Sequence, residues 1–128
     1  MSAFTIAVTC LALNIYHEAR GESIQGMQAV ALVTKNRSRV TNKPICEVVH
    51  SPNQFSWTIY KPKATDPKSY KLAEKIAIDV LTGKVSDITG GATFYHSIKV
   101  SPNWRNKFVY RKRIGNHLFY FTTEKPLV

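Results

Sequence analysis

Cysteine is scarce in this chain of 128 residues, which contains only Cys10 and Cys46. Two cysteines cannot build the disulfide framework of a small secreted scaffold, and neither their number nor their spacing suggests a zinc site. Each lies among apolar residues, so we expect two buried thiols. A single bridge is the alternative if the chain works in an oxidising compartment.

The sequence also lacks a hydrophobic run long enough to span a membrane, which needs about 20 residues. No basic segment precedes the apolar N-terminal stretch, and cleavage near Ala12 would cut just before the most polar motif of this region. A signal peptide is therefore not expected, and we interpret the stretch as a core helix. Repeats, low-complexity tracts and linkers are missing too, which favours one domain over residues 1–128.

Acidic residues are few, with 8 Asp and Glu against 18 Lys and Arg and a net charge of +10. None of the acidic residues falls between positions 88 and 123, a segment that holds six Lys and Arg. Such a charge suggests an anionic partner: nucleic acid, an anionic membrane face or an acidic polymer such as a bacterial cell wall. A solvated basic face that only aids solubility is the alternative.

The hydrophobic periodicity predicts helices first and a small sheet late. Helices are expected over residues 4–20, 24–39 and 66–81, with a short helical turn over 44–49. The first is apolar on nearly every side, so other elements should enclose it. Residues 50–69 should form an ordered loop, and strands are expected around residues 92–98 and on both sides of Gly115-Asn116. The fold class is α+β: one domain, with helices around a central buried helix and an antiparallel sheet or hairpin near the C-terminus.

The stretch "IYHEARGES" (residues 15–23) contains the first half of a zincin motif, in which a Glu follows a metal-binding His. The second His would have to occupy position 21, which is Gly. The other three histidines, His50, His96 and His117, are scattered along the chain. We therefore expect no metal and no cofactor.

Glu18 is the candidate catalytic acid. Cleavage of a glycosidic bond needs a carboxylic acid that stays protonated near neutral pH. Burial against an apolar helix and the negative end of the helix dipole should both raise the pKa of Glu18. The nearby charges of His17 and Arg20 should not face it, because residues one or two apart point in different directions on a helix.

Glu22 is the candidate second carboxylate. On an unbroken helix it would share a face with Glu18, but Gly21 separates the two. Glu22 then precedes the second helix, where a capping role is favoured. Without a second carboxylate, one acid can still cleave a sugar chain if a hydroxyl of the substrate attacks, which is lytic transglycosylation and leaves an anhydro-sugar.

Six blocks occur in order along the chain: "LALNIYHEARGES", "GMQAVALVTKNR", "PICEVVHSPNQFSW", "GATFYHS", "PNW" and "IGNHLFY". Together they resemble the SleB/CwlJ-type cell wall hydrolases over about residues 11–120. The resemblance implies a lysozyme-like fold and cleavage of peptidoglycan between N-acetylmuramic acid and N-acetylglucosamine, by a muramidase or a lytic transglycosylase. It also implies that the acid is the first Glu of the Glu-Ala-Arg-Gly-Glu motif, Glu18.

The chain departs from spore-cortex members because it has no evident export signal and no separate wall-binding domain. This departure suggests a phage endolysin, a monomer that waits in the host cytoplasm until a holin releases it to the wall. Its positive charge would suit an anionic envelope. The alternatives are a nucleic-acid-binding module, which would rest on the basic, aromatic segment 106–114, and a wall-binding virion protein without turnover.

Several side chains outside the motif are candidates for substrate contact. They are Gln54, Ser56, Trp57, Tyr95, His96, Trp104 and His117. Trp57 should either stack on a sugar ring or pack in the core, whereas Phe55 is expected to be core. Only one of Tyr95 and His96 should face a cleft, since neighbours on a strand point to opposite faces. Asn36 and Arg37 are expected to tie the second helix to the rest of the fold.

Overall fold

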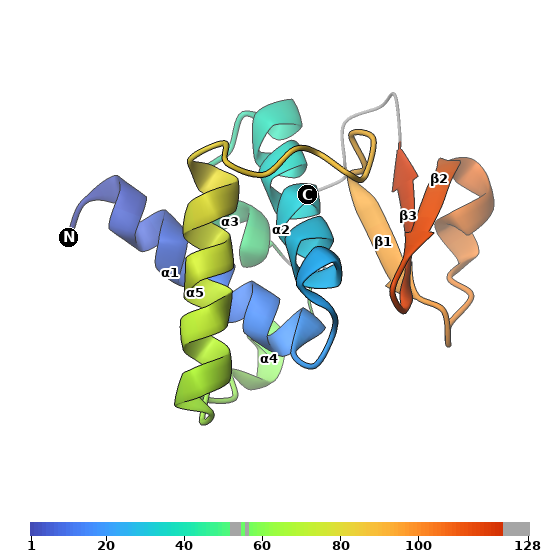
Figure 1. The fold of residues 1–128 in the computed structure, drawn as a ribbon. Helices are drawn as coiled ribbons and strands as arrows, with labels where there is room; N and C mark the ends of the chain where they lie inside the picture. Colours follow the sequence, from blue (N-terminus) through green and yellow to red (C-terminus); the bar gives the residue numbers. More distant parts are fainter. Residues whose placement is uncertain (52–54, 56, 122–128) are drawn as a thin grey trace.

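The structure, a computed structural model, describes residues 1–51, 55 and 57–121. Its elements follow the predicted order, helices first and sheet last (Figure 1). The helices are α1 (Ala3–Ala19), α2 (Ile24–Thr41), α3 (Ile45–Val49), α4 (Trp57–Tyr60) and α5 (Pro67–Leu81). The strands are β1 (Phe94–Ser97), β2 (Val109–Ile114) and β3 (His117–Phe121), and a 3-10 helix, η1 (Asn103–Lys107), precedes β2. The predicted α+β class is confirmed.

The three long helices begin at side-chain caps. The hydroxyl of Ser2 accepts a hydrogen bond from the Thr5 amide, and Ser23 does the same for the Gly26 amide. Asp66 caps α5 with Pro67 at the first helical position. These caps satisfy amides that the helices themselves leave unpaired.

The helices pack together around α1, which contacts α2, α3 and α5. Figure 1 shows α2 between α5 and the sheet, and α2 contacts both. The middle and C-terminal parts of α1 are buried, with Leu11 and Ile15 fully inaccessible. The prediction that α1 is enclosed along its length is wrong for its first turns, where Phe4 is 47% and Ile6 44% exposed, because none of the described elements covers them.

Cys10 and Cys46 form a disulfide bond, so the expectation of two buried thiols is wrong. The packing of α3 on α1 brings their Cα atoms to 5.3 Å, a separation that a disulfide spans easily. The two residues lie 36 positions apart in the sequence. Their proximity therefore results from the packing of two helices, which the local pattern around either cysteine does not reveal.

The sheet is antiparallel with strand order β1-β3-β2, so β3 is central. Strands β2 and β3 form the predicted hairpin through the two-residue turn Gly115-Asn116, in which Gly115 has a φ of +57°. In the pairing of β1 with β3, Tyr95 lies opposite Phe119 and His96 lies opposite Leu118. Side chains of neighbouring strand residues therefore project to opposite faces of the sheet.

Side chains of α2 tie it to the chain entering the sheet, as expected. Asn36 donates to the Asp87 carboxylate and to the Ala92 carbonyl, both at 3.0 Å. The Arg37 guanidinium donates to the Thr93 carbonyl.

Two short elements, α4 and η1, were not predicted, because neither is long enough to show a period. Over the described residues, no helix has both the length and the apolar character needed to cross a membrane.

Candidate active site

Glu18 lies in the last turn of α1, where the helix ends before Gly21, whose φ is +88°. Its carboxylate is half-buried, and Oε1 accepts a hydrogen bond from the Tyr95 hydroxyl at 2.6 Å. Burial raises the pKa of Glu18, and the Tyr95 hydrogen bond opposes this only in part. The direction agrees with the sequence-based expectation. The result is a carboxyl group that keeps its proton to a higher pH than an exposed Glu does.

Tyr95 reaches Glu18 from β1, 77 positions further along the chain. Its ring packs among aromatic groups, with centroid distances of 5.2 Å to His117 and 5.7 Å to Phe119. Burial, together with the neighbouring carboxylate of Glu18, raises the pKa of Tyr95 well above its usual value, so the phenol stays protonated and donates. Because the phenol occupies Oε1, the acidic proton of Glu18 is best accommodated on Oε2.

A second group of rings lies beside Glu18 on the same end of α1. The His17 imidazole stacks on Trp57 at a centroid distance of 4.8 Å, and burial lowers its pKa. The Trp57 indole nitrogen donates to Asn14 Oδ1 at 2.8 Å. Asn14 was missed by the sequence analysis, although a fully buried amide in an apolar helix usually has a specific partner. It lies one turn before Glu18 and therefore on the same helical face.

Glu22 does not cap α2, since Ser23 takes that position, and the expected capping role is wrong. Its carboxylate instead accepts two hydrogen bonds from Asn116, from the backbone amide at 3.1 Å and from Nδ2 at 3.0 Å. His117 Nδ1 lies 3.8 Å from Oε1. Burial alone would raise the pKa of Glu22, but the Asn116 hydrogen bonds and the field of His117 outweigh it, so the pKa is lowered.

The other predicted contact residues divide into two groups. Tyr95, Trp57 and His117 lie around Glu18 and Glu22, whereas His96 points to the opposite face of the sheet. There His96 shares a hydrogen bond of 2.8 Å with the Tyr120 hydroxyl, and Trp104 packs against both rings. Gln54 and Ser56 lie outside the described residues. The role of each residue in substrate contact stays a prediction.

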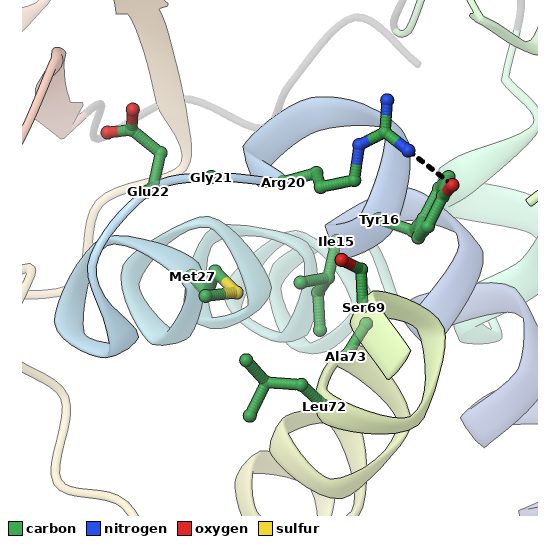
Figure 2. A pocket seen from close by; sticks show the side chains of 9 residues that line it. All are labelled: Ile15, Tyr16, Arg20, Gly21, Glu22, Met27, Ser69, Leu72 and Ala73. Carbon is green, nitrogen blue, oxygen red and sulfur yellow. Dashed lines mark hydrogen bonds between the residues drawn. The ribbon is translucent and has the colours of Figure 1, made fainter. Parts of the chain in front are cut away.

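A cavity of about 230 Å³ opens between the end of α1, the start of α2 and α5. Its lining residues are Ile15, Tyr16, Arg20, Gly21, Glu22, Met27, Ser69, Leu72 and Ala73 (Figure 2). Figure 2 shows the Glu22 carboxylate turned away from Met27 and Leu72, and Arg20 donating to the Tyr16 hydroxyl. Glu18 does not line this cavity. Over the part of the chain that the structure describes, no three His, Cys, Asp or Glu side chains cluster as a metal site would require.

Comparison with known proteins gives relatives of one kind. The chain is 33% identical over 123 residues to a spore cortex-lytic enzyme of Halalkalibacterium halodurans, and 31% identical over 123 residues to one of Bacillus cereus. Each alignment covers 88% of this chain but only 34% and 43% of the relative, so the chain spans well under half the length of these proteins.

Two solved structures share its fold. One is the catalytic domain of the germination-specific lytic transglycosylase SleB from Bacillus anthracis, with a TM-score of 0.75, 28% identity and coverage of 90% of this chain and 93% of that one. The other is the catalytic domain of the Bacillus cereus SleB protein, with a TM-score of 0.76, 28% identity and coverage of 91% of each chain. The model of the Cell Wall Hydrolase family matches residues 21–120. The chain therefore belongs to the cell wall hydrolase family.

Proposed function

We propose that this chain cleaves the glycan strand of peptidoglycan between N-acetylmuramic acid and N-acetylglucosamine, as a lytic transglycosylase with Glu18 as its acid and base. The observation that carries the proposal is the half-buried Glu18 carboxyl, with its raised pKa and one oxygen held by Tyr95. The likeness to a catalytic domain described as a lytic transglycosylase supports the same reaction. A hydrolytic muramidase is the second form of the reaction.

In this reaction the protonated Glu18 donates its proton to the glycosidic oxygen as the bond to C1 of the muramic acid residue breaks. The glucosamine leaves with that proton. The ionised Glu18 then removes the proton from the C6 hydroxyl of the same muramic acid, and the C6 oxygen attacks C1. Glu18 is protonated again, a 1,6-anhydro bond has formed, and no water is consumed.

The surroundings of Glu22 favour this route over a double displacement. A retaining enzyme needs a second carboxylate free to attack C1, about 5–5.5 Å from the acid. Here each Glu22 oxygen accepts a hydrogen bond from Asn116. An intramolecular hydroxyl needs no such nucleophile. Transglycosylation therefore fits the described groups with Glu18 alone.

Trp57 is our candidate for a sugar platform beside the acid. Its indole is half-buried and held at one edge by Asn14, while His17 covers one face. Fixed aromatic rings of this kind offer apolar area at little entropic cost. We propose that Trp57, Tyr95 and His117 line the sugar site.

The site of action that we propose is the bacterial wall. The Cys10–Cys46 disulfide supports it, because thiols are kept reduced in most cytosols and bridges persist outside them. Lysis of a host after release by a holin is a finer proposal. Expression in a bacterium with and without a holin tests it, and lysis only in the presence of the holin is the expected result.

The test of the reaction is mass spectrometry of purified peptidoglycan digested by the chain and by its Glu18→Gln variant. A 1,6-anhydro-muramic acid end is the expected product of the first and should be missing from the second. A free reducing muramic acid would indicate a hydrolytic muramidase instead. A reducing glucosamine would contradict the bond assignment, and salt-sensitive DNA binding without glycan cleavage would favour the nucleic-acid alternative.

A further inference from the structure

The Glu22 side chain joins two parts of the fold that are far apart in sequence. The backbone amide of Glu22 donates to the Ala19 carbonyl at 3.0 Å, which fixes Glu22 relative to the last turn of α1. Its carboxylate binds Asn116 of the β2–β3 turn, 94 positions further along the chain. The turn approaches so closely that a Cβ on Gly115 would lie 2.8 Å from Glu22 Oε1.

The same turn holds the strand that carries Tyr95. The Asn116 carbonyl accepts a hydrogen bond from the Ile98 amide at 2.9 Å, directly after the end of β1. His117 follows Asn116, and its ring lies against Tyr95 with the two planes inclined at 63°. The Tyr95 hydroxyl then returns to Glu18. These contacts form a closed path from the end of α1, through the turn and β1, and back to the Glu18 carboxyl.

We propose that Glu22 is a positioning residue and not a second reacting carboxylate: by holding Asn116 it keeps the β2–β3 turn, and with it the Tyr95 hydroxyl, in place on Glu18. The inference rests on the proposed function, in which Glu18 is the acid. It assigns each glutamate of the motif its own task. Glu18 exchanges the proton with the substrate, and Glu22 keeps the Tyr95 hydroxyl in position to bind Glu18.

The bonding of Glu22 supports this assignment. Both oxygens accept hydrogen bonds from the protein, and the lowered pKa means that the group is ionised over the range in which Glu18 titrates. A constant negative charge with fixed amide partners suits a structural acceptor. His117 is an ionisable neighbour, and because burial lowers its pKa, the Asn116 hydrogen bonds are the contacts that hold the ionised Glu22 near neutral pH.

Two variants separate the positioning role from a reacting one. Glu22→Gln and Asn116→Ala should each lower kcat on peptidoglycan by between about tenfold and a hundredfold with little change in KM, since misplacement of a catalytic group costs this much. The kcat of the double variant should be no lower than that of the less active single variant, because both substitutions act through one contact. If Glu22 reacts directly, Glu22→Gln will lose far more than Asn116→Ala, which overturns the proposal, as would full activity in both variants.

The pH dependence of kcat/KM gives a second measurement, which a smaller amount of folded protein would not change. The Tyr95 hydrogen bond lowers the pKa of Glu18, so its loss should shift the basic limb of kcat/KM to higher pH. Both variants should show this shift, as should Tyr95→Phe. Other titratable or charged groups in this region are His17, which precedes Glu18 on α1, and His117 on β3 and Arg37 on α2, which act on Tyr95. An unmoved limb would overturn the proposal.

Gly115→Ala offers a third way to open the contact without altering either partner. Its Cβ would collide with Glu22, and the backbone φ of +57° adds strain. Gly83→Ala is the matched control, because Gly83 has a φ of +78° with nothing within 4 Å of the added Cβ. We expect loss of kcat and the same pH shift only for Gly115→Ala, and equal behaviour of the two variants would contradict the positioning role of Glu22.

The proposed function and the positioning role fail in different ways. If the chain releases no anhydro-sugar from peptidoglycan, the function is wrong. The pKa of Glu18, followed by NMR of the labelled carboxyl carbon, then still tests the positioning role without turnover. A pKa that rises in Glu22→Gln and Asn116→Ala supports it, and one that stays at the wild-type value in both variants overturns it.

Discussion

The helical region, residues 1–87, and the sheet region, residues 88–121, differ in charge and in the side chains that hold them together. The helical region carries seven of the eight Asp and Glu residues, and the sheet region carries none but has six Lys and Arg. The helical core is mainly aliphatic, whereas eight of the 14 aromatic residues fall in the sheet region. The candidate site lies where the two meet.

The two regions together make up the surroundings of the Glu18 carboxyl. The helical region supplies Glu18 and the buried end of a helix, and the sheet region supplies the aromatic surroundings and the Tyr95 donor. An acidic sheet region would add negative charge beside Glu18 and Glu22. Because the sheet region is basic, it is the part of the molecule that we expect to be attracted to an anionic wall.

Glu18→Gln removes the contribution of the helical region and should have the largest effect. We expect kcat to fall by roughly a hundredfold or more, since a general acid contributes about that much. Stability should not fall. The folded-state pKa of Glu18 lies above its unfolded value of 4.5, so ionisation costs stability as the pH rises through this interval, and Gln avoids that cost.

Thermal unfolding of both proteins at pH 4 and pH 7 checks the second point. The gain in stability of Glu18→Gln over the wild type should be larger at pH 7 than at pH 4. A variant that keeps more than about a tenth of the wild-type kcat would rule out Glu18 as the acid.

Removal of the Cys10–Cys46 bond by substitution of both cysteines tests the helical region alone. Closing a loop of this length contributes roughly 3–4 kcal/mol in the chain-entropy description. We expect the double Cys→Ser variant to have a lower urea midpoint, with a free energy of unfolding reduced by at most this amount. Its kcat under native conditions should remain near that of the wild type, because both residues lie far along α1 and α3 from Glu18.

Tyr95→Phe removes the contribution of the sheet region and should have a smaller effect on rate. The ring and its packing remain, but the donor to Glu18 is lost, so the pKa of Glu18 should rise further and the basic limb should move to higher pH. We expect a loss of between about tenfold and a hundredfold in kcat, the same range as for Glu22→Gln, because Glu22 acts through this hydroxyl. Tyr110→Phe is the matched control: Tyr110 is in the same sheet and 51% exposed, and its loss should change neither quantity.

Charge reversal in the sheet region should have the smallest effect. Lys107→Glu with Lys112→Glu should slow the digestion of whole walls several-fold at low salt, and the loss should disappear at high salt because exposed charges are then screened. Lys68→Glu with Lys71→Glu in the helical region changes the net charge equally and serves as the control. All four lysines are exposed. Equal losses in the two pairs would show that net charge matters and not its location.

Much of the fold was predictable because its signals are local. The Asp66-Pro67 pair and the Gly115-Asn116 turn each mark an element boundary through their own backbone chemistry. The short helix α4 and the 3-10 helix η1 carry no such signal. The exposure of Phe4 and Ile6 was missed for another reason, since an apolar side chain does not reveal whether a neighbour is present to cover it.

The sequence by itself determined the helices, the hairpin and the place of Glu18 at the end of a buried helix. Only the tertiary structure decided which groups meet there: Tyr95 on Glu18, Asn116 on Glu22, and Cys10 with Cys46. The physical reason is range. Caps, turns and helical periods act over a few residues, whereas these pairs are separated by 77, 94 and 36 positions and form only when helices and sheet pack together.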